Sequence, residues 1–444
     1  MKTKSFFSYV MSIAVPVALQ SMLQSSFSMI DQVMVGQLGS TSIAAIGIAG
    51  KFAFMYATMV GAIAAIAGIM ISQYMGQKNS RFAYKSVAVN LTSALSLGTV
   101  FMMLSLFLPN RIMNLYSEDT AAIREAANYL KIISATYVPL GIASILSVML
   151  RCSGKAKFPL YASIVSAFTN TGLNYLLIFG NLGCPTLGVK GAAIASFISQ
   201  FVNALLVFVF YRHFQRKKTY NKLSAESGGK LNIKQYFVML LPVLLTEFLW
   251  SFGQNVYTLI YGHIGTKELA AVSLISPVES LLIGALSGLA QAAGILIGKR
   301  LGEEKYDKAY SESKLLMMYG FVGSVVLSLL LILLKGLYVD IYNVEDFVRN
   351  SAVWLLVAFA VLAPFKVQNM ILGNGILRSG GKTHYIMWID LLGTWVLGVP
   401  LGFLVSYYLH FPVAWVYFVI GFEEIIRWIA CVILYKSKKW IVKL

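Results

Sequence analysis

An acidic residue, Asp31, lies inside the first long apolar stretch of the chain, and two amide side chains precede it. Gln20, Gln24 and Asp31 are spaced by four and seven residues, which places them on one face of a helix. Ionisable groups inside apolar segments are costly and usually face a cavity. The pattern predicts a carboxylate that binds a cation or a proton. An acid that is only paired near a helix end is the alternative.

Two asparagines further along the chain offer matching ligands. Asn170 and Asn174 are one helical turn apart, so their amide oxygens lie on one face. Carboxylate and amide oxygens together suit a hard cation such as Na⁺, or a carboxylate that binds a proton. The alternative is a pair of asparagines that fixes helix packing through hydrogen bonds. From the residues alone both interpretations stay open: Na⁺ ligands at Asp31, Asn170 and Asn174 with Ser196 adding a hydroxyl to the cation-coupling site, or helix packing.

A second polar stripe follows in the other half of the chain, at spacings of three, four and three residues. These spacings again correspond to one helix face. We expect the stripe to bind a substrate together with Gln20 and Gln24. The stripe consists of Glu247, Trp250, Gln254 and Tyr257.

Several other charged residues lie inside apolar segments, and the sequence assigns them no role. Glu423 and Arg427 are four residues apart, and we expect them to neutralise each other. The others are Glu279, Lys366 and Asp390.

The elements that position these side chains must be membrane-spanning helices. Of the 444 residues, 58% are hydrophobic and only 12% are charged, about half the charged fraction of a soluble domain. Apolar stretches long enough to cross a bilayer of about 30 Å occur twelve times. They lie near residues 8–36, 44–74, 86–108, 121–150, 158–180, 189–212, 235–262, 268–298, 311–335, 347–376, 384–408 and 411–435.

The distribution of basic residues predicts the orientation. Every second loop is rich in lysine and arginine, so the positive-inside rule places both termini in the cytoplasm of a cell whose inner membrane holds the protein. The same loops account for the net charge of +18, and no nucleic-acid partner is predicted. Nucleotide-binding and hydrolase motifs are absent from the sequence, so we expect no enzyme, and energy must come from an ion gradient or the process is passive.

An internal repeat predicts the domain organisation. Aligning Pro16 with Pro242 brings matching residues together at a constant offset, and residues 151–155 match 378–382 with one residue of slippage. Six spans per half make the repeats parallel, and such lobes leave a cleft for alternating access. We expect an all-α membrane protein with an N-lobe at 1–213, a basic linker at 214–233 and a C-lobe at 234–444. The matches include Gly36 with Gly262, Gly39 with Gly265, Gly68-Ile69 with Gly294-Ile295 and Gly76 with Gly302.

The chain resembles the multidrug and toxic compound extrusion (MATE) family over almost its whole length. No single motif carries the resemblance, but the ordered set is specific. It consists of Pro16, Ser28–Gly36, Gly39, Ala44-Ala45, Gly68, Gly76, Arg151–Lys155, Asn170–Asn174, Gly188, Gly191–Ser196, Arg378–Lys382 and Gly398–Pro400.

The resemblance implies antiport of Na⁺ or H⁺ against small organic cations or drugs. Family members hold a cation with an acid on the first helix, two polar residues on the fifth and a hydroxyl on the sixth. These match Asp31, Asn170 with Asn174, and Ser196. Some members use an acid on the seventh helix, matching Glu247. An acid on the tenth has no counterpart here because that stretch carries Lys366, which puts a sodium site in the C-lobe in doubt.

Two other functions fit parts of the pattern. A flippase for a lipid-linked saccharide shares the two-lobed plan, but such exporters carry basic cavities, whereas Asp31 and Glu247 make the expected cavity acidic. A membrane enzyme would need a clustered catalytic set, which the sequence lacks. A seven-span receptor would need an odd number of spans, whereas the repeat predicts an even number. The resemblance suggests a monomer surrounded by membrane lipids.

Overall fold

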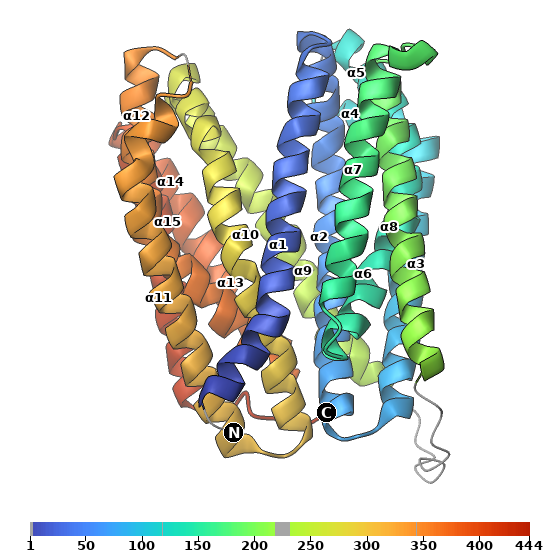
Figure 1. The fold of residues 1–444 in the computed structure, drawn as a ribbon. Coiled ribbons are helices and arrows are strands. Elements are labelled where there is room, and N and C mark those ends of the chain that lie inside the picture. Colours follow the sequence, from blue (N-terminus) through green and yellow to red (C-terminus); the bar gives the residue numbers. More distant parts are fainter. Residues whose placement is uncertain (1–2, 118, 218–230, 343) are drawn as a thin grey trace. The chain divides into compact units, whose positions relative to one another are not determined.

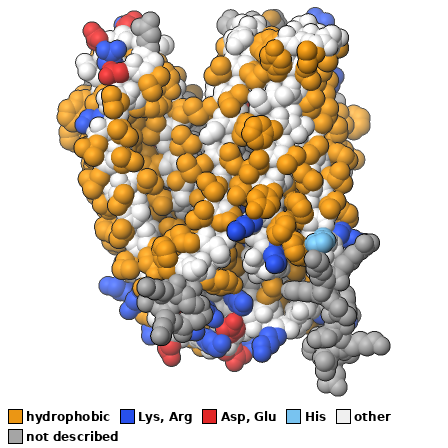
Figure 2. Space-filling view, viewed as in Figure 1, with side chains coloured by type: hydrophobic (Ala, Val, Ile, Leu, Met, Phe, Trp, Pro, Cys, Tyr) orange, Lys and Arg blue, Asp and Glu red, His pale blue; other side chains and the backbone are white. Residues whose placement is uncertain are grey.

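The protein is all-α. The computed structural model describes residues 3–117, 119–217, 231–342 and 344–444, and every regular element in these ranges is helical (Figure 1). Helices suit a chain of this composition because backbone groups in lipid must find hydrogen-bond partners within the protein. Hydrophobic side chains cover the long sides of the helices, and charged side chains gather towards their ends (Figure 2). This distribution is the one that a bilayer requires.

The first half of the chain contains six stretches that are long and apolar enough to cross a membrane. The fourth of them combines two helices, α5 and α6, joined by one 3₁₀ turn at Ser134–Thr136. The helices are α1 (Thr3–Gly36), α2 (Ser40–Gly76), α3 (Ser80–Phe107), α4 (Pro109–Met113), α5 (Thr120–Ile133), α6 (Tyr137–Cys152), α7 (Lys157–Phe179) and α8 (Val189–Lys217).

The second half adds five such stretches and one more long helix, α15, which carries charged residues in its middle. The predicted boundaries agree with these helices to within several residues. Two spans contain wide π-helical turns, one at Asn369–Leu377 and the other at Leu392–Gly398 and Leu404–Tyr408. The helices are α9 (Ile233–Ile264), α10 (Thr266–Gly302), α11 (Tyr306–Val339), α12 (Asp346–Gln368), α13 (Thr383–Leu391), α14 (Val399–Phe403) and α15 (Val413–Lys436).

Contacts between residues divide the chain into two compact units. One unit contains Met22–Ile71 and Asn79–Leu231, and the other contains Met1–Ser21, Ser72–Lys78 and Asn232–Leu444. The division into lobes at 1–213 and 234–444 stays a prediction. Of the linker predicted at 214–233, residues 218–230 lie outside the described residues.

Glycine allows helices to approach closely within each unit. A Cβ atom on Gly191 of α8 would lie 2.5 Å from the backbone oxygen of Leu177 in α7, and one on Gly288 of α10 would lie 2.0 Å from that of Ala14 in α1. Neither position has space for a side chain. Such contacts through small residues are how helices pack when lipid removes the hydrophobic drive for association.

Candidate functional site

Asp31 of α1 contacts the first predicted partner directly. The Nδ2 atom of Asn174, on α7, donates a hydrogen bond to Oδ1 of Asp31 at 2.6 Å. Asn174 is only 1% exposed, and its own Oδ1 is buried without a hydrogen-bond partner among the described residues. The carboxylate therefore meets an amide that has one acceptor to spare.

Asn170 and Ser196 complete the same group. The Nδ2 atom of Asn170 lies 3.4 Å from Oγ of Ser196 on α8, and its Oδ1 accepts a hydrogen bond from Asn174 at 3.3 Å. In this orientation the Asn170 amide oxygen faces Asp31. Turning the amide by half a rotation places its nitrogen 2.7 and 2.9 Å from the two carboxylate oxygens. The structure thus brings together all four residues of the predicted coupling set.

Local packing explains why these side chains meet. Asn170 and Asn174 share a face of α7, which packs closely against α8 where Gly191 leaves no side chain in the way. A hydrogen bond of 2.7 Å from Ser166 on α7 to the backbone oxygen of Ser199 on α8 holds the two helices in register. Ser196 therefore lies beside Asn170.

The arrangement offers two charge states to Asp31. An amide nitrogen facing a carboxylate stabilises the ionised acid by donating to it. An amide oxygen facing a carboxylate is favourable only when a proton or a cation lies between the two oxygens. The same group could also bind Na⁺, because a hard cation prefers oxygen ligands. The oxygen ligands here are the Asp31 carboxylate, the Asn170 oxygen, the unpaired Asn174 oxygen and the Ser196 hydroxyl.

The two glutamines on α1 have different environments. Gln20 is 9% exposed and belongs to the unit that contains the second half of the chain, whereas Gln24 is exposed and belongs to the unit of Asp31. Their predicted role in binding a substrate stays a prediction.

Glu247 lies against a buried arginine, and its predicted role in substrate binding stays a prediction. Nη1 of Arg378 is 3.3 Å from Glu247, and its Nη2 is 3.4 Å from Asp390. Arg378 is 4% exposed. Asp390 also accepts hydrogen bonds from Arg427, and Trp250 lines a small cavity beside it. Sequence spacing missed this network because its members come from α9, α13, α15 and the turn at Arg378–Gly380.

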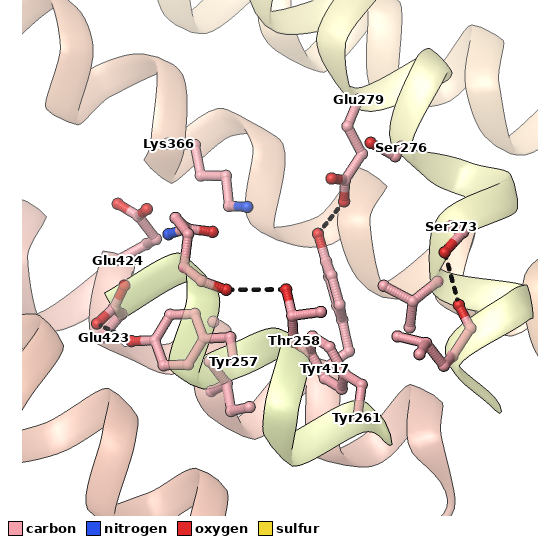
Figure 3. Close-up of a pocket in the computed structure, with 15 residues that line it drawn as sticks. Tyr257, Thr258, Tyr261, Ser273, Ser276, Glu279, Lys366, Tyr417, Glu423 and Glu424 are labelled. Atoms are coloured by element: carbon pink, nitrogen blue, oxygen red, sulfur yellow. Dashed lines mark hydrogen bonds between the residues drawn. The ribbon is translucent and has the colours of Figure 1, made fainter. Parts of the chain in front are cut away.

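The other two residues of the stripe line a larger cavity of about 270 Å³ in the same unit (Figure 3). Gln254 and Tyr257 of α9 both border it. Thr258 and Tyr261 of the same helix and residues from α10, α12 and α15 form the remaining walls, and four of the lining residues are charged. These are Glu279, Lys366, Glu423 and Glu424.

Hydrogen bonds hold the acids in this wall. The hydroxyl of Tyr257 donates to Oε2 of Glu423 at 2.8 Å, and the hydroxyl of Tyr417 donates to Glu279. The pairing expected between Glu423 and Arg427 is not among the described ion pairs. Arg427 pairs with Asp390 and with Glu424, at 3.5 Å, because a side chain three residues away is also on its face.

Similarity to known proteins agrees with this architecture. The family model described as MatE matches residues 16–176 and 242–404, and both segments begin at the prolines that the internal repeat aligns. The uncharacterized transporter YisQ of Bacillus subtilis (strain 168) is 21% identical over 447 aligned residues, which cover 100% of this chain and 96% of that protein. The probable multidrug resistance protein NorM of Bacillus thuringiensis subsp. konkukian (strain 97-27) is 25% identical, and the alignment covers 91% and 90%.

Solved structures share the fold. A crystal structure of MATE in complex with MaL6 superimposes with a TM-score of 0.87 at 17% identity, covering 97% of this chain and 95% of that one. Because the family model matches both halves and most of the chain, the protein belongs to the MatE family and is a multi-pass membrane transporter rather than an enzyme.

Proposed function

We propose that the protein exports small organic cations or drugs across the cytoplasmic membrane in exchange for Na⁺ or H⁺, and that Asp31 is the coupling site. The contact between Asp31 and Asn174 supports this assignment most directly, because it joins a membrane-depth carboxylate to an amide with a spare acceptor. Family membership and the relative described as a probable multidrug resistance protein support the substrate class.

The chemistry at Asp31 gives such an exchanger its two states. In one state the carboxylate is ionised and takes hydrogen bonds from the amides of Asn170 and Asn174. In the other a proton or Na⁺ neutralises it, and the amide oxygens turn towards the bound charge. An ion shifts a conformational equilibrium only through different affinities for the two conformations. The proposal therefore requires that the amides orient differently in the two conformations.

The proposal includes the predicted topology. Both termini are placed in the cytoplasm because the basic loops require it, and the two repeats act as lobes that alternate access to the substrate. Gln254 and Tyr257 are proposed to contact the substrate, since both line a cavity.

Dye efflux from proteoliposomes tests the proposal. Purified protein is reconstituted, loaded with ethidium, and exposed to an inward Na⁺ gradient and an inward H⁺ gradient in separate experiments. We expect one of the two gradients to drive ethidium out at several times the rate without a gradient. Equal rates with and without both gradients would contradict antiport. Movement of a fluorescent lipid-linked saccharide in place of ethidium would favour the flippase.

A further inference from the structure

The larger cavity is lined by charges of both signs that form no direct ion pair with each other within 4 Å. Three carboxylates and one ammonium group border it, and all four belong to one unit of the protein. In the described part of the chain, Lys366 forms no ion pair within 4 Å and no hydrogen bond. Its Nζ atom lies over two aromatic rings, 5.6 Å from the centroids of Phe359 and Tyr417.

Two of the carboxylates are in a similar position. Glu279 and Glu423 have no ion pair within 4 Å among the described residues, and each accepts a hydrogen bond from a tyrosine hydroxyl. Glu424 differs, because it pairs with Arg427 and accepts a hydrogen bond from Asn369. Among the described residues, two acids and one base thus line the cavity without a direct ion pair within 4 Å.

Tyr417 keeps the opposite charges apart. Its hydroxyl group donates to Glu279, while the face of its ring is turned to the ammonium group of Lys366. Figure 3 shows Lys366 pointing into the space that the tyrosines and glutamates surround. Charges held inside a membrane protein normally pair or mark a binding site. Here Lys366, Glu279 and Glu423 face the cavity and form no direct ion pair with any residue that the structure describes, which is the pattern of a binding site.

A ligand that completes this arrangement must carry both signs. A simple organic cation satisfies the glutamates but is repelled by Lys366, and a simple anion is repelled by the glutamates. We infer that the cavity between α9, α10, α12 and α15 binds a small amphoteric molecule, with its anionic group on Lys366 and its cationic group on Glu279 and Glu423. The cavity volume is near the lower end of ligand pockets, about 300 Å³, which favours a compact ligand.

The inference deepens the transport function proposed above by naming a substrate class, and it rests on that function only for the step of export. A matched pair of probes tests it. 4-(Aminomethyl)benzoate carries an amine and a carboxylate at opposite ends of one ring, and its methyl ester carries the amine alone. Both are labelled with tritium, and equilibrium binding to the full purified chain is measured by scintillation proximity.

We expect the wild type to bind the acid at least tenfold more tightly than the ester, since hydrogen bonds to charged groups contribute differences of this size. Lys366→Met should remove this preference, and Lys366→Arg should retain it. Glu279→Gln should weaken both probes. Lys335→Met serves as the matched control, because Lys335 of α11 bonds to the backbone oxygen of Ile332 and to no other group that the structure describes, and it does not line the cavity.

Equal binding of the two probes by the wild type, or a preference that survives Lys366→Met, would overturn the inference. The outcome is independent of coupling, because binding at equilibrium needs no ion gradient. Asp31→Asn should therefore leave the ratio between the probes unchanged while it stops efflux. Loss of folding in Lys366→Met is detected by comparing its size-exclusion elution profile with that of Lys335→Met. In that case Lys366→Arg is the test variant, and loss of the preference for the acid in this variant would contradict the inference.

Discussion

Two groups of polar residues at membrane depth differ in how their charges are balanced. The group around Asp31 contains one carboxylate and three neutral side chains, Asn170, Asn174 and Ser196. The group around Arg378 contains acids and bases that pair directly, with Asp390 shared between Arg378 and Arg427. Arg378 lies in the turn between the spans predicted at 347–376 and 384–408, whereas all the other members of both groups lie within predicted spans.

This difference indicates that the first group exchanges an ion and that the second group stabilises the fold. Among the described residues, Asp31 has amides and a hydroxyl beside it and no ion pair within 4 Å, so a proton or a cation can bind and leave. A carboxylate between two guanidinium groups has its charge balanced by covalently attached groups that do not leave. We therefore expect substitutions in the first group to affect transport, and substitutions in the second to affect stability.

The largest effect is expected from Asp31→Asn. The substitution keeps the shape of the side chain but removes the charge that binds the coupling ion, so ion-driven efflux should fall at least a hundredfold. Ethidium efflux from proteoliposomes measures the rate, and the amount of protein in the membrane shows that insertion is normal. Efflux at the wild-type rate would remove Asp31 from the coupling mechanism.

Arg378→Met should lower the stability of the protein more than it lowers transport. Removing one partner of a buried ion pair costs about 3–5 kcal/mol, because the remaining charges lose their compensation. Thermal unfolding in detergent should show a clear loss, partly restored by the double substitution of Arg378→Met with Glu247→Met. Lys267→Met is the control, since the pair of Lys267 with Glu345 is exposed and should contribute little. Unchanged stability would show that the network is not structural.

Asn174→Ala sharpens the comparison within the first group. The substitution removes the hydrogen bond to Asp31 and the spare oxygen, and a hydrogen bond to a charged group contributes about 1.5–3 kcal/mol. Ion-driven efflux should fall about tenfold or more, with the coupling ion required at a higher concentration. Asn181→Ala, which alters an exposed hydrogen bond to the Tyr175 backbone, should have no such effect. Equal behaviour of the two variants would argue against a coupling role for Asn174.

Gly191→Ala should have the smallest effect. Its Cβ atom would lie 2.5 Å from the Leu177 oxygen, so α7 and α8 must separate slightly, at a cost of about 1–3 kcal/mol. Gly172→Ala is the matched control, because nothing lies within 4 Å of a Cβ atom there. We expect reduced stability and weaker coupling only for Gly191→Ala. A neutral result at both positions would mean that the contact between the two helices adapts easily.

Much of the architecture could be read from the sequence. The lengths of the apolar segments predicted the spans, and residues near Pro16 and Pro242 predicted the repeat that the family model matches. The spacing of Asn170 and Asn174 predicted one helix face, and that face does meet Asp31. The coupling role of these residues stays a prediction.

Other contacts could not be read in this way. Spacing suggested a pair between Glu423 and Arg427, but residues three and four apart compete for the same partner. Arg427 instead reaches Asp390, which is 37 positions away in the chain. Glu247 was expected to face a substrate, and nothing near it in sequence indicates Arg378.

The sequence by itself determined where the chain crosses the membrane and that the chain is doubled, because the length of hydrophobic segments and the spacing of residues can be read from the linear sequence. The tertiary structure alone decided which charges are balanced and which face a cavity. Hydrogen bonds and ion pairs act over about 3–4 Å, so they depend on which distant helices come together. That arrangement leaves Asp31 among amides, and it leaves Lys366 and Glu279 on either side of one tyrosine.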